Sequence, residues 1–133
     1  MANLRLDILC PDGEIFSGEA KSILVTTTEG QIQLLAGHAD LIAALGTGVA
    51  KLTLTDGTER VAAASGGFIT ADKNGVRVIA TTFEFSENIN VERARRAKES
   101  AEEKLKSAKS EREAEILRAK LLRAICRINV SSM

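Results

Sequence analysis

The chain has 133 residues, 44% of them apolar, which is enough for one ordinary domain and a small appendage. Its 18 basic and 18 acidic residues cancel, and this balance argues against nucleic acid or an anionic membrane as the main partner. Cys10 and Cys126 match no metal or redox spacing, so we expect reduced thiols in an intracellular protein. No stretch is typical of a signal peptide or a membrane span, so we expect membrane association only through partners.

The neutral total conceals two halves of opposite charge. Residues 1–88 hold 6 basic and 11 acidic side chains, a net of −5, and residues 89–133 hold 12 and 7, a net of +5. All 10 glycines, the single proline and the 4 phenylalanines lie at or before Phe85. This shift in composition predicts two domains, 1–88 and 89–133.

Short β-type runs separated by turn residues fill the first domain. Asp56-Gly57 and Asn74-Gly75 suit two-residue hairpin turns, because both residue pairs tolerate positive φ. We expect an all-β sandwich or flattened barrel of about ten antiparallel strands. The candidate strands are 3–9, 14–17, 20–28, 31–35, 41–45, 49–55, 59–64, 68–71, 76–81 and 83–85.

The second domain changes to a helical period, with apolar residues recurring every three or four positions in two stripes that are separated near 107–110. Asn90 suits the N-cap of a first helix, and Ser110 with Glu113 forms a capping box for a second. We therefore expect an α-helical hairpin of helices 91–106 and 111–128. The first stripe, which includes Ala97, is mostly alanine and buries little area, so we expect the hairpin to separate easily from the sandwich.

Residues 29–48 contain the only histidine, His38, in a Gly-His-Ala-Asp turn between two apolar runs, 32–35 and 41–45. The sequence offers His38 no nucleophile motif and no second histidine for a metal site, and it has no glycine-rich phosphate loop with a lysine. We therefore expect no catalytic and no metal site. The turn is typical of a contact surface.

Three motifs together resemble a known family. They are the 29–48 segment, the Ser-Gly-Gly-Phe run at 65–68, and Ile-Asn-Val-Glu-Arg-Ala at 89–94. They resemble the epsilon subunit of the bacterial and plastid F-type ATP synthase, which is called delta in mitochondria. In the first motif the chain departs from the family at Ala36 and Asp40, where a proline is common. It keeps Glu29, Gly30, Gly37, His38, Leu41, Leu45 and Gly48.

The resemblance implies a non-catalytic rotor subunit of the central stalk, which couples rotation of the proton-carrying ring to ATP synthesis. It implies a peripheral place at the cytoplasmic face of the bacterial inner membrane or of a photosynthetic membrane. The implied partners are the gamma shaft, the membrane c-ring and the catalytic alpha/beta head. Glu29, His38 and Asp40 are the candidates for contact with the shaft and the ring.

The second helix carries a basic stripe of Lys120, Arg123 and Arg127, which its spacing places on one face. A solvated face, an acidic protein partner and a nucleotide phosphate all account for such a stripe. The resemblance implies that the basic tail can extend, enter the acidic cleft of the catalytic head and inhibit ATP hydrolysis. Charge complementarity would speed that encounter.

Some members of the family bind ATP at the folded hairpin. The residues that match their pattern here are Glu84, Arg93, Ala94, Arg123 and Arg127. Asn90 replaces the family's aspartate but can still cap the helix and accept hydrogen bonds, and Ser100 stands where a further arginine can occur. The five candidate nucleotide-binding residues are therefore Glu84, Asn90, Arg93, Arg123 and Arg127. No cofactor is therefore required, but ATP stays open as a regulatory ligand. An ATP-sensing hairpin is one alternative function, and a generic β-sandwich adaptor with a coiled, dimerising tail is the other.

Overall fold

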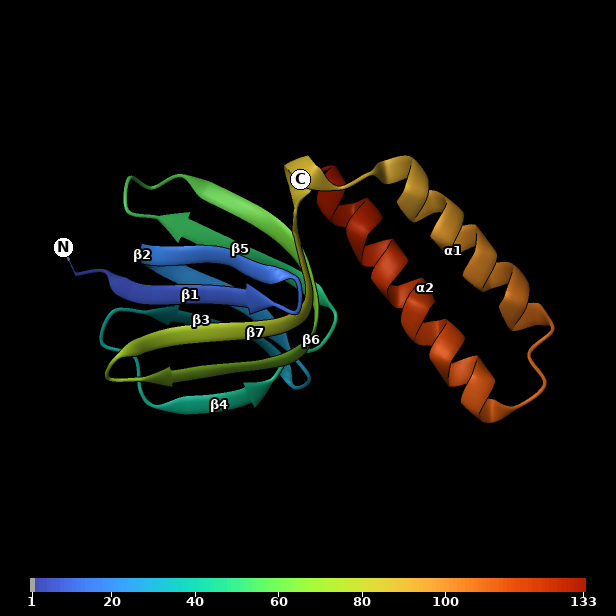
Figure 1. Ribbon diagram of the computed structural model, residues 1–133, viewed down its shortest axis with the longest axis horizontal. Coiled ribbons are helices and arrows are strands. Elements are labelled where there is room, and N and C mark those ends of the chain that lie inside the picture. The colour runs from blue at the N-terminus through green and yellow to red at the C-terminus, as the bar shows by residue number, and fades with distance from the viewer. Residues whose placement is uncertain (1) are drawn as a thin grey trace.

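The structure is a computed structural model that describes residues 2–133. The β-sandwich forms one end of the molecule, and the helical hairpin forms the other (Figure 1). This confirms the predicted order of an all-β part followed by two helices. In the described range the strands are β1 (Leu4–Cys10), β2 (Gly13–Thr27), β3 (Gly30–Leu35), β4 (Leu41–Ala44), β5 (Gly48–Leu54), β6 (Glu59–Asp72) and β7 (Gly75–Phe85). A 3₁₀ turn, η1 (Ser86–Asn88), leads to α1 (Val91–Lys106) and α2 (Glu111–Ser131).

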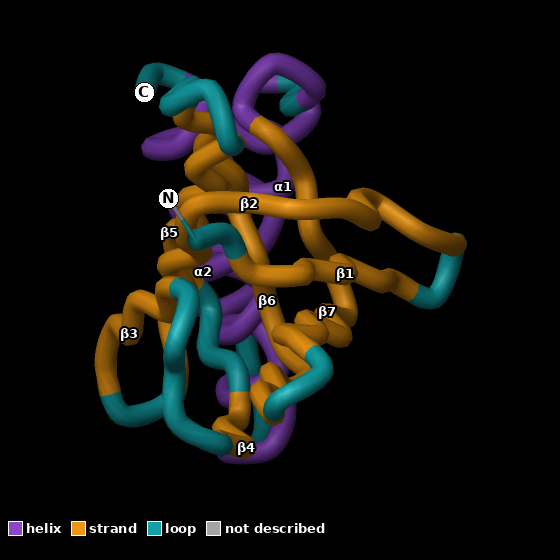
Figure 2. The backbone as a smooth tube through the Cα atoms, turned by 90° about the vertical axis from the view of Figure 1, so that its left-hand side faces the viewer, coloured by secondary structure: helices purple, strands orange, loops and turns teal. Residues whose placement is uncertain are grey.

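Five strands close into a ring. Their order is β1-β7-β6-β5-β2, and β2 pairs with β1 again. β3 adds to β2, and β4 adds to β6. Figure 2 shows the strands in front, with the helices behind them. The pairing of β1 with β7 is parallel, so the expectation of a wholly antiparallel sandwich is wrong at this one place.

The prediction of about ten strands is also wrong, since the described residues form seven. Three predicted breaks do not interrupt the ladder. Gly18 stays extended opposite Leu6, and Thr82 continues β7 opposite Ser65. A pairing partner therefore keeps each strand continuous where the local sequence suggests a turn.

The third break, at Gly66-Gly67, is a corner within β6. Before it β6 pairs with β5, and after it with β4, so one strand serves both layers of the sandwich. Gly66 and Gly67 have φ of 73° and 90°, a region that favours glycine. A Cβ on Gly67 would lie 1.9 Å from the carbonyl oxygen of Ile79, so this corner requires glycine.

The core follows from strand alternation. Leu4, Leu6 and Ile8 point inward from β1 and are buried, while Arg5 between them is exposed. Fully burying a side chain of this size contributes roughly 1.5–3 kcal/mol. The largest fully buried side chains of the sandwich are Leu6, Ile8, Ile23, Val25, Leu52, Ile69, Val76 and Val78.

Both helices begin at the predicted caps. The side-chain oxygen of Asn90 accepts from the Arg93 amide at 3.0 Å, and that of Ser110 accepts from the Glu113 amide at 3.1 Å. Glu113 accepts from the Lys109 amide at 3.3 Å, one residue earlier than a standard capping box. α2 runs three residues past the predicted end at 128. Within the described residues, neither helix combines the length and the apolarity that crossing a bilayer requires.

The seam between the helices is narrow, as predicted. Ala94 and Ala101 of α1 are buried, as are Leu117 and Ala124 of α2. Ala97, which the pattern places in the seam, is exposed, so the seam is interrupted there.

Candidate functional site

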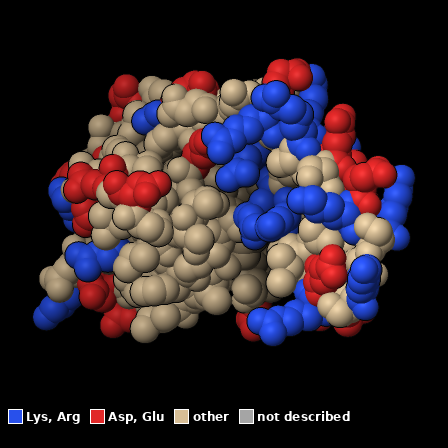
Figure 3. Space-filling model, turned by 45° about the vertical axis from the view of Figure 1, so that its right-hand side comes forward, with Lys and Arg blue, Asp and Glu red and all other residues tan. Residues whose placement is uncertain are grey.

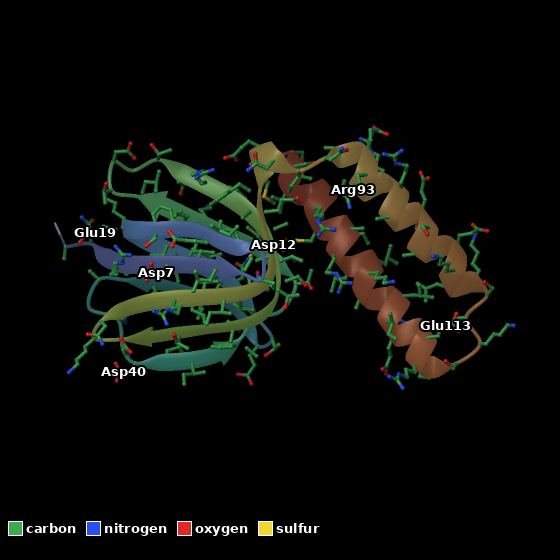
Figure 4. The ribbon with its side chains drawn as sticks, in the orientation of Figure 1. Asp7, Asp12, Glu19, Asp40, Arg93 and Glu113 are labelled. Carbon is green, nitrogen blue, oxygen red and sulfur yellow. The ribbon has the colours of Figure 1, made fainter. Side chains whose placement is uncertain are left out.

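The end of the sandwich away from the hairpin carries the connection between β3 and β4. Figure 4 places Asp40 at this end and Arg93 on α1 at the opposite side of the molecule. Asp40 is exposed, and His38 is half-buried with its Nδ1 3.3 Å from the Ala39 carbonyl oxygen. Both side chains stay accessible to a partner.

Glu29 does not join His38 and Asp40. It lies in the turn between β2 and β3, where its amide donates to Thr27 Oγ1 at 3.2 Å. β3 (Gly30–Leu35) separates this turn from the β3–β4 connection, a distance of roughly 17 Å at about 3.4 Å per residue. A single compact contact therefore cannot use all three residues. In residues 2–133 no three His, Cys, Asp or Glu side chains gather in a group that could hold a metal ion.

An apolar surface that the sequence analysis missed lies on the outer face of β4 and β6. Ile42 is 79% exposed and Phe68 is 42% exposed. Ala44, also exposed, pairs with Phe68 across the ladder. Large exposed apolar residues that gather on one face mark interaction sites more often than scattered ones do. The signal was present in the sequence, because the run at 41–45 has no polar residue at alternate positions.

The hairpin and the last strand form a groove of about 420 Å³. It brings together Glu84, Asn90, Arg93 and Arg127, four of the five residues expected for a nucleotide. Asn90 uses its side-chain oxygen to cap α1, and its side-chain NH₂ group is left as a donor for a ligand.

A second groove of about 230 Å³ continues between the helices. Arg123, the fifth expected residue, lines it together with Lys120, and Arg127 and Ala97 line both grooves. Lys104 also lines it and was missed, because its position depends on how the two helices pack. Figure 3 shows Lys and Arg side chains gathered over the hairpin and its junction with the sandwich.

Arg127 also connects the hairpin to the sandwich. Its Nε lies 3.4 Å from Glu84 Oε1, and the two side chains are 32% and 39% exposed.

Cys126, the residue before Arg127 in α2, packs with Ala63 and Val130 in a small apolar cluster. Burial there raises the pKa of the Cys126 thiol, and Arg127 opposes this. Both grooves therefore adjoin the only charged contact between the sandwich and the hairpin in the described part of the chain.

Two family patterns match the chain. Residues 3–86 match "ATP synthase, Delta/Epsilon chain, beta-sandwich domain" and residues 87–132 match "ATP synthase, Delta/Epsilon chain, long alpha-helix domain". The first range covers all seven strands, and the second covers both helices.

Individual relatives agree over nearly the whole length. The chain is 36% identical to the ATP synthase epsilon chain of Shouchella clausii, covering 98% of this chain and 96% of that protein. It is also 36% identical to the epsilon chain of Caldanaerobacter subterraneus subsp. tengcongensis, covering 96% of this chain and 93% of that protein.

Solved structures share the fold. A chain in the mitochondrial ATP synthase of Euglena gracilis superimposes with a TM-score of 0.85 at 23% identity, covering 100% of this chain and 83% of that chain. A chain in the central stalk and c-ring of the Tetrahymena thermophila enzyme gives 0.56 at 13% identity, covering 65% and 69%. The sequence matches carry the assignment, and from them the chain belongs to the family of ATP synthase delta/epsilon chains.

Proposed function

We propose that this chain is a non-catalytic rotor subunit in the central stalk of a proton-translocating F-type ATP synthase, where it couples ring rotation to ATP synthesis. The observation that carries the proposal is the match of both domains to one family, with 36% identity over 98% of the chain. A generic adaptor with a dimerising tail does not account for this match. The subunit would sit peripherally at the cytoplasmic face of the membrane and be held there by its partners.

Residues 1–88 would be the domain that holds the gamma shaft against the c-ring. The exposed apolar surface of Ile42, Ala44 and Phe68 suits a permanent protein partner, because such interfaces bury large apolar side chains. Within this proposal His38 and Asp40 contact one partner at the far end of the sandwich. Glu29, at the other end of β3, contacts a second partner or a separate part of the first.

Residues 89–133 would be the regulatory domain that inhibits ATP hydrolysis. Lys120, Arg123 and Arg127 line one wall of the interhelical groove, and no ion pair within the described residues holds Lys120 or Arg123. The charges of Lys120 and Arg123 stay available for the acidic cleft of the alpha/beta head, where they would guide the encounter.

The test is to titrate the full chain into the catalytic head with its shaft and to record binding and ATP hydrolysis. The variant Ile42→Asp with Phe68→Ser should still fold, because both residues are already exposed in the folded chain. We expect it to lose binding, because it removes the exposed apolar surface. We expect the variant Lys120→Gln, Arg123→Gln and Arg127→Gln to bind but not to inhibit. Unchanged binding by the first variant contradicts the proposed clamp, and unchanged inhibition by the second contradicts the brake.

A second candidate function, reading the ATP concentration, is supported by the first groove. Glu84, Asn90, Arg93 and Arg127 line one groove, although the sequence separates them by up to 43 positions (127 − 84). Calorimetry with ATP tests it. Heat that saturates in the millimolar range and disappears in Arg93→Gln supports sensing, and no heat removes it.

A further inference from the structure

The hairpin is attached to the sandwich by a small contact near the end of α2. Val130 is fully buried, and it packs with Ala63 of β6 and with Ile89. The only ion pair that joins the two parts within residues 2–133 is Arg127 with Glu84, at 3.4 Å. An interface of this size permits motion of one part relative to the other.

The linker that leads into the hairpin has a separate attachment. Arg60 of β6 lies over the ring of Phe85, with its Cζ 3.7 Å from the ring centroid, and it forms an ion pair with Glu87 of η1. Phe85 is itself fixed in the core, where it meets Phe83 edge-to-face at 5.4 Å between ring centroids. Arg60 therefore joins the end of β7 and η1 directly to the sandwich, although η1 also lies against α2.

Ile89 extends this attachment by one residue. Its amide donates to the Ser86 carbonyl oxygen at 3.3 Å, and its side chain, 9% exposed, belongs to the apolar cluster that contains Ala63 and Val130. After the loss of Val130 this cluster would keep its members from the sandwich, Ala63, Val49 and Val61.

The attachment of the linker to the sandwich ends at Asn90. Asn90 is exposed, its backbone is extended (φ −84°, ψ 101°), and its side chain is committed to capping α1. α1 packs along α2, and its contacts elsewhere are slight. Beyond Ile89 the chain is therefore attached to the sandwich almost entirely through α2.

We propose that the hinge of the hairpin lies between Ile89 and Asn90, and that Arg60 is a positioning residue that keeps Ser86–Asn88 with the sandwich when the hairpin is released. This inference stands apart from the rotor assignment, because it concerns motion within the free chain.

The test is ¹⁵N relaxation by NMR on the full chain, in which Val130→Glu releases the hairpin by placing a charge in a fully buried position. We expect α1 and α2 to move independently of the sandwich. The amides of residues 86–89 should keep the order parameters of the sandwich, about 0.85, with the change in mobility falling between 89 and 90.

Adding Arg60→Gln to Val130→Glu should shift that change back to the end of β7, near Phe85. The matched control is Glu59→Gln, which removes the neighbouring surface ion pair with Lys51 at 3.8 Å and should leave the change at 89–90. The inference is overturned if residues 86–89 move with the hairpin in Val130→Glu alone, if Arg60→Gln has no more effect than the control, or if the hairpin stays docked in Val130→Glu.

Discussion

The sandwich and the hairpin are stabilised by different means. The sandwich buries eighteen apolar side chains in one cluster, enclosed by a ring of five paired strands. The cluster that docks the hairpin has three buried members, of which only Val130 comes from the helices. Long-range strand pairing makes the sandwich one cooperative unit. The alanine seam and the short docking contact leave the hairpin free to open at lower cost. A chain with this contrast can hold one partner firmly and move its tail.

The largest expected effect is at the corner of β6. In Gly67→Ala the new Cβ would lie 1.9 Å from the Ile79 oxygen at a φ of 90°, so we expect a loss of about 3 kcal/mol or more in the free energy of unfolding. Gly57→Ala is the control, because φ is also 90° but no atom lies within 4 Å, and we expect a loss of about 1–2 kcal/mol. Urea unfolding followed by circular dichroism measures both. Equal losses would mean that the close approach at Gly67 is relieved without cost.

Two fully buried valines compare the regions directly. Val78 lies in the sandwich core and Val130 in the docking cluster, each at 0% exposure. Val78→Ala should lower the free energy of unfolding of the sandwich by about 1.5–3 kcal/mol. Val130→Ala should leave that value unchanged and speed amide exchange in α2. If both variants lower the stability of the sandwich equally, the hairpin is part of its cooperative unit.

A smaller effect is expected at the ion pair between Glu84 and Arg127. Both side chains are about a third exposed, so Arg127→Gln should favour opening of the hairpin by at most about 1 kcal/mol. Salt at about 1 M should have the same effect on the natural chain and little on the variant. Amide exchange of α2 is the measurement. Arg118→Gln is the control, because its partner Glu111, at 3.1 Å, is on the hairpin too. A salt response that persists in Arg127→Gln would assign docking to other charges.

The smallest effect concerns Glu87. The hydrogen bond from Arg60 holds the pKa of the Glu87 carboxyl below its usual range. A lowered pKa in the folded chain means that the contribution of this pair is present above the ordinary glutamate value of about 4.3, and is lost as the pH falls through the lowered value. NMR titration should show the pKa of Glu87 rising toward the ordinary range in Arg60→Gln but not in Lys51→Gln. The same titration curve in both variants would argue against the Arg60 contact.

Local signals in the sequence predicted the helices well. The caps at Asn90 and Ser110 mark their starts, because a cap depends on side chains within three residues of it. The number of strands was not predictable in the same way. Whether Gly18 or Thr82 ends a strand depends on residues opposite them in the ladder, which the local sequence does not specify.

In the candidate sites, too, local sequence predicted some features, and the packing of distant segments determined the others. The shared face of Lys120, Arg123 and Arg127 follows from helical spacing alone. The place of Lys104 in that groove depends on how two helices pack, and the exposure of Ile42 and Phe68 depends on which sheet face lacks a cover. The separation of Glu29 from His38 required knowing that β3 runs straight between their turns.

Native-state hydrogen exchange of the full chain, read residue by residue, tests most directly whether the two regions are separate units. Amides of β1, β5 and β6 should exchange only through global unfolding, while those of α1 and α2 should exchange through an opening of distinctly lower free energy. Denaturant should affect the first group strongly and the second weakly. If both groups exchange with one free energy and one denaturant dependence, the sandwich and the hairpin unfold together and the contrast between them is wrong.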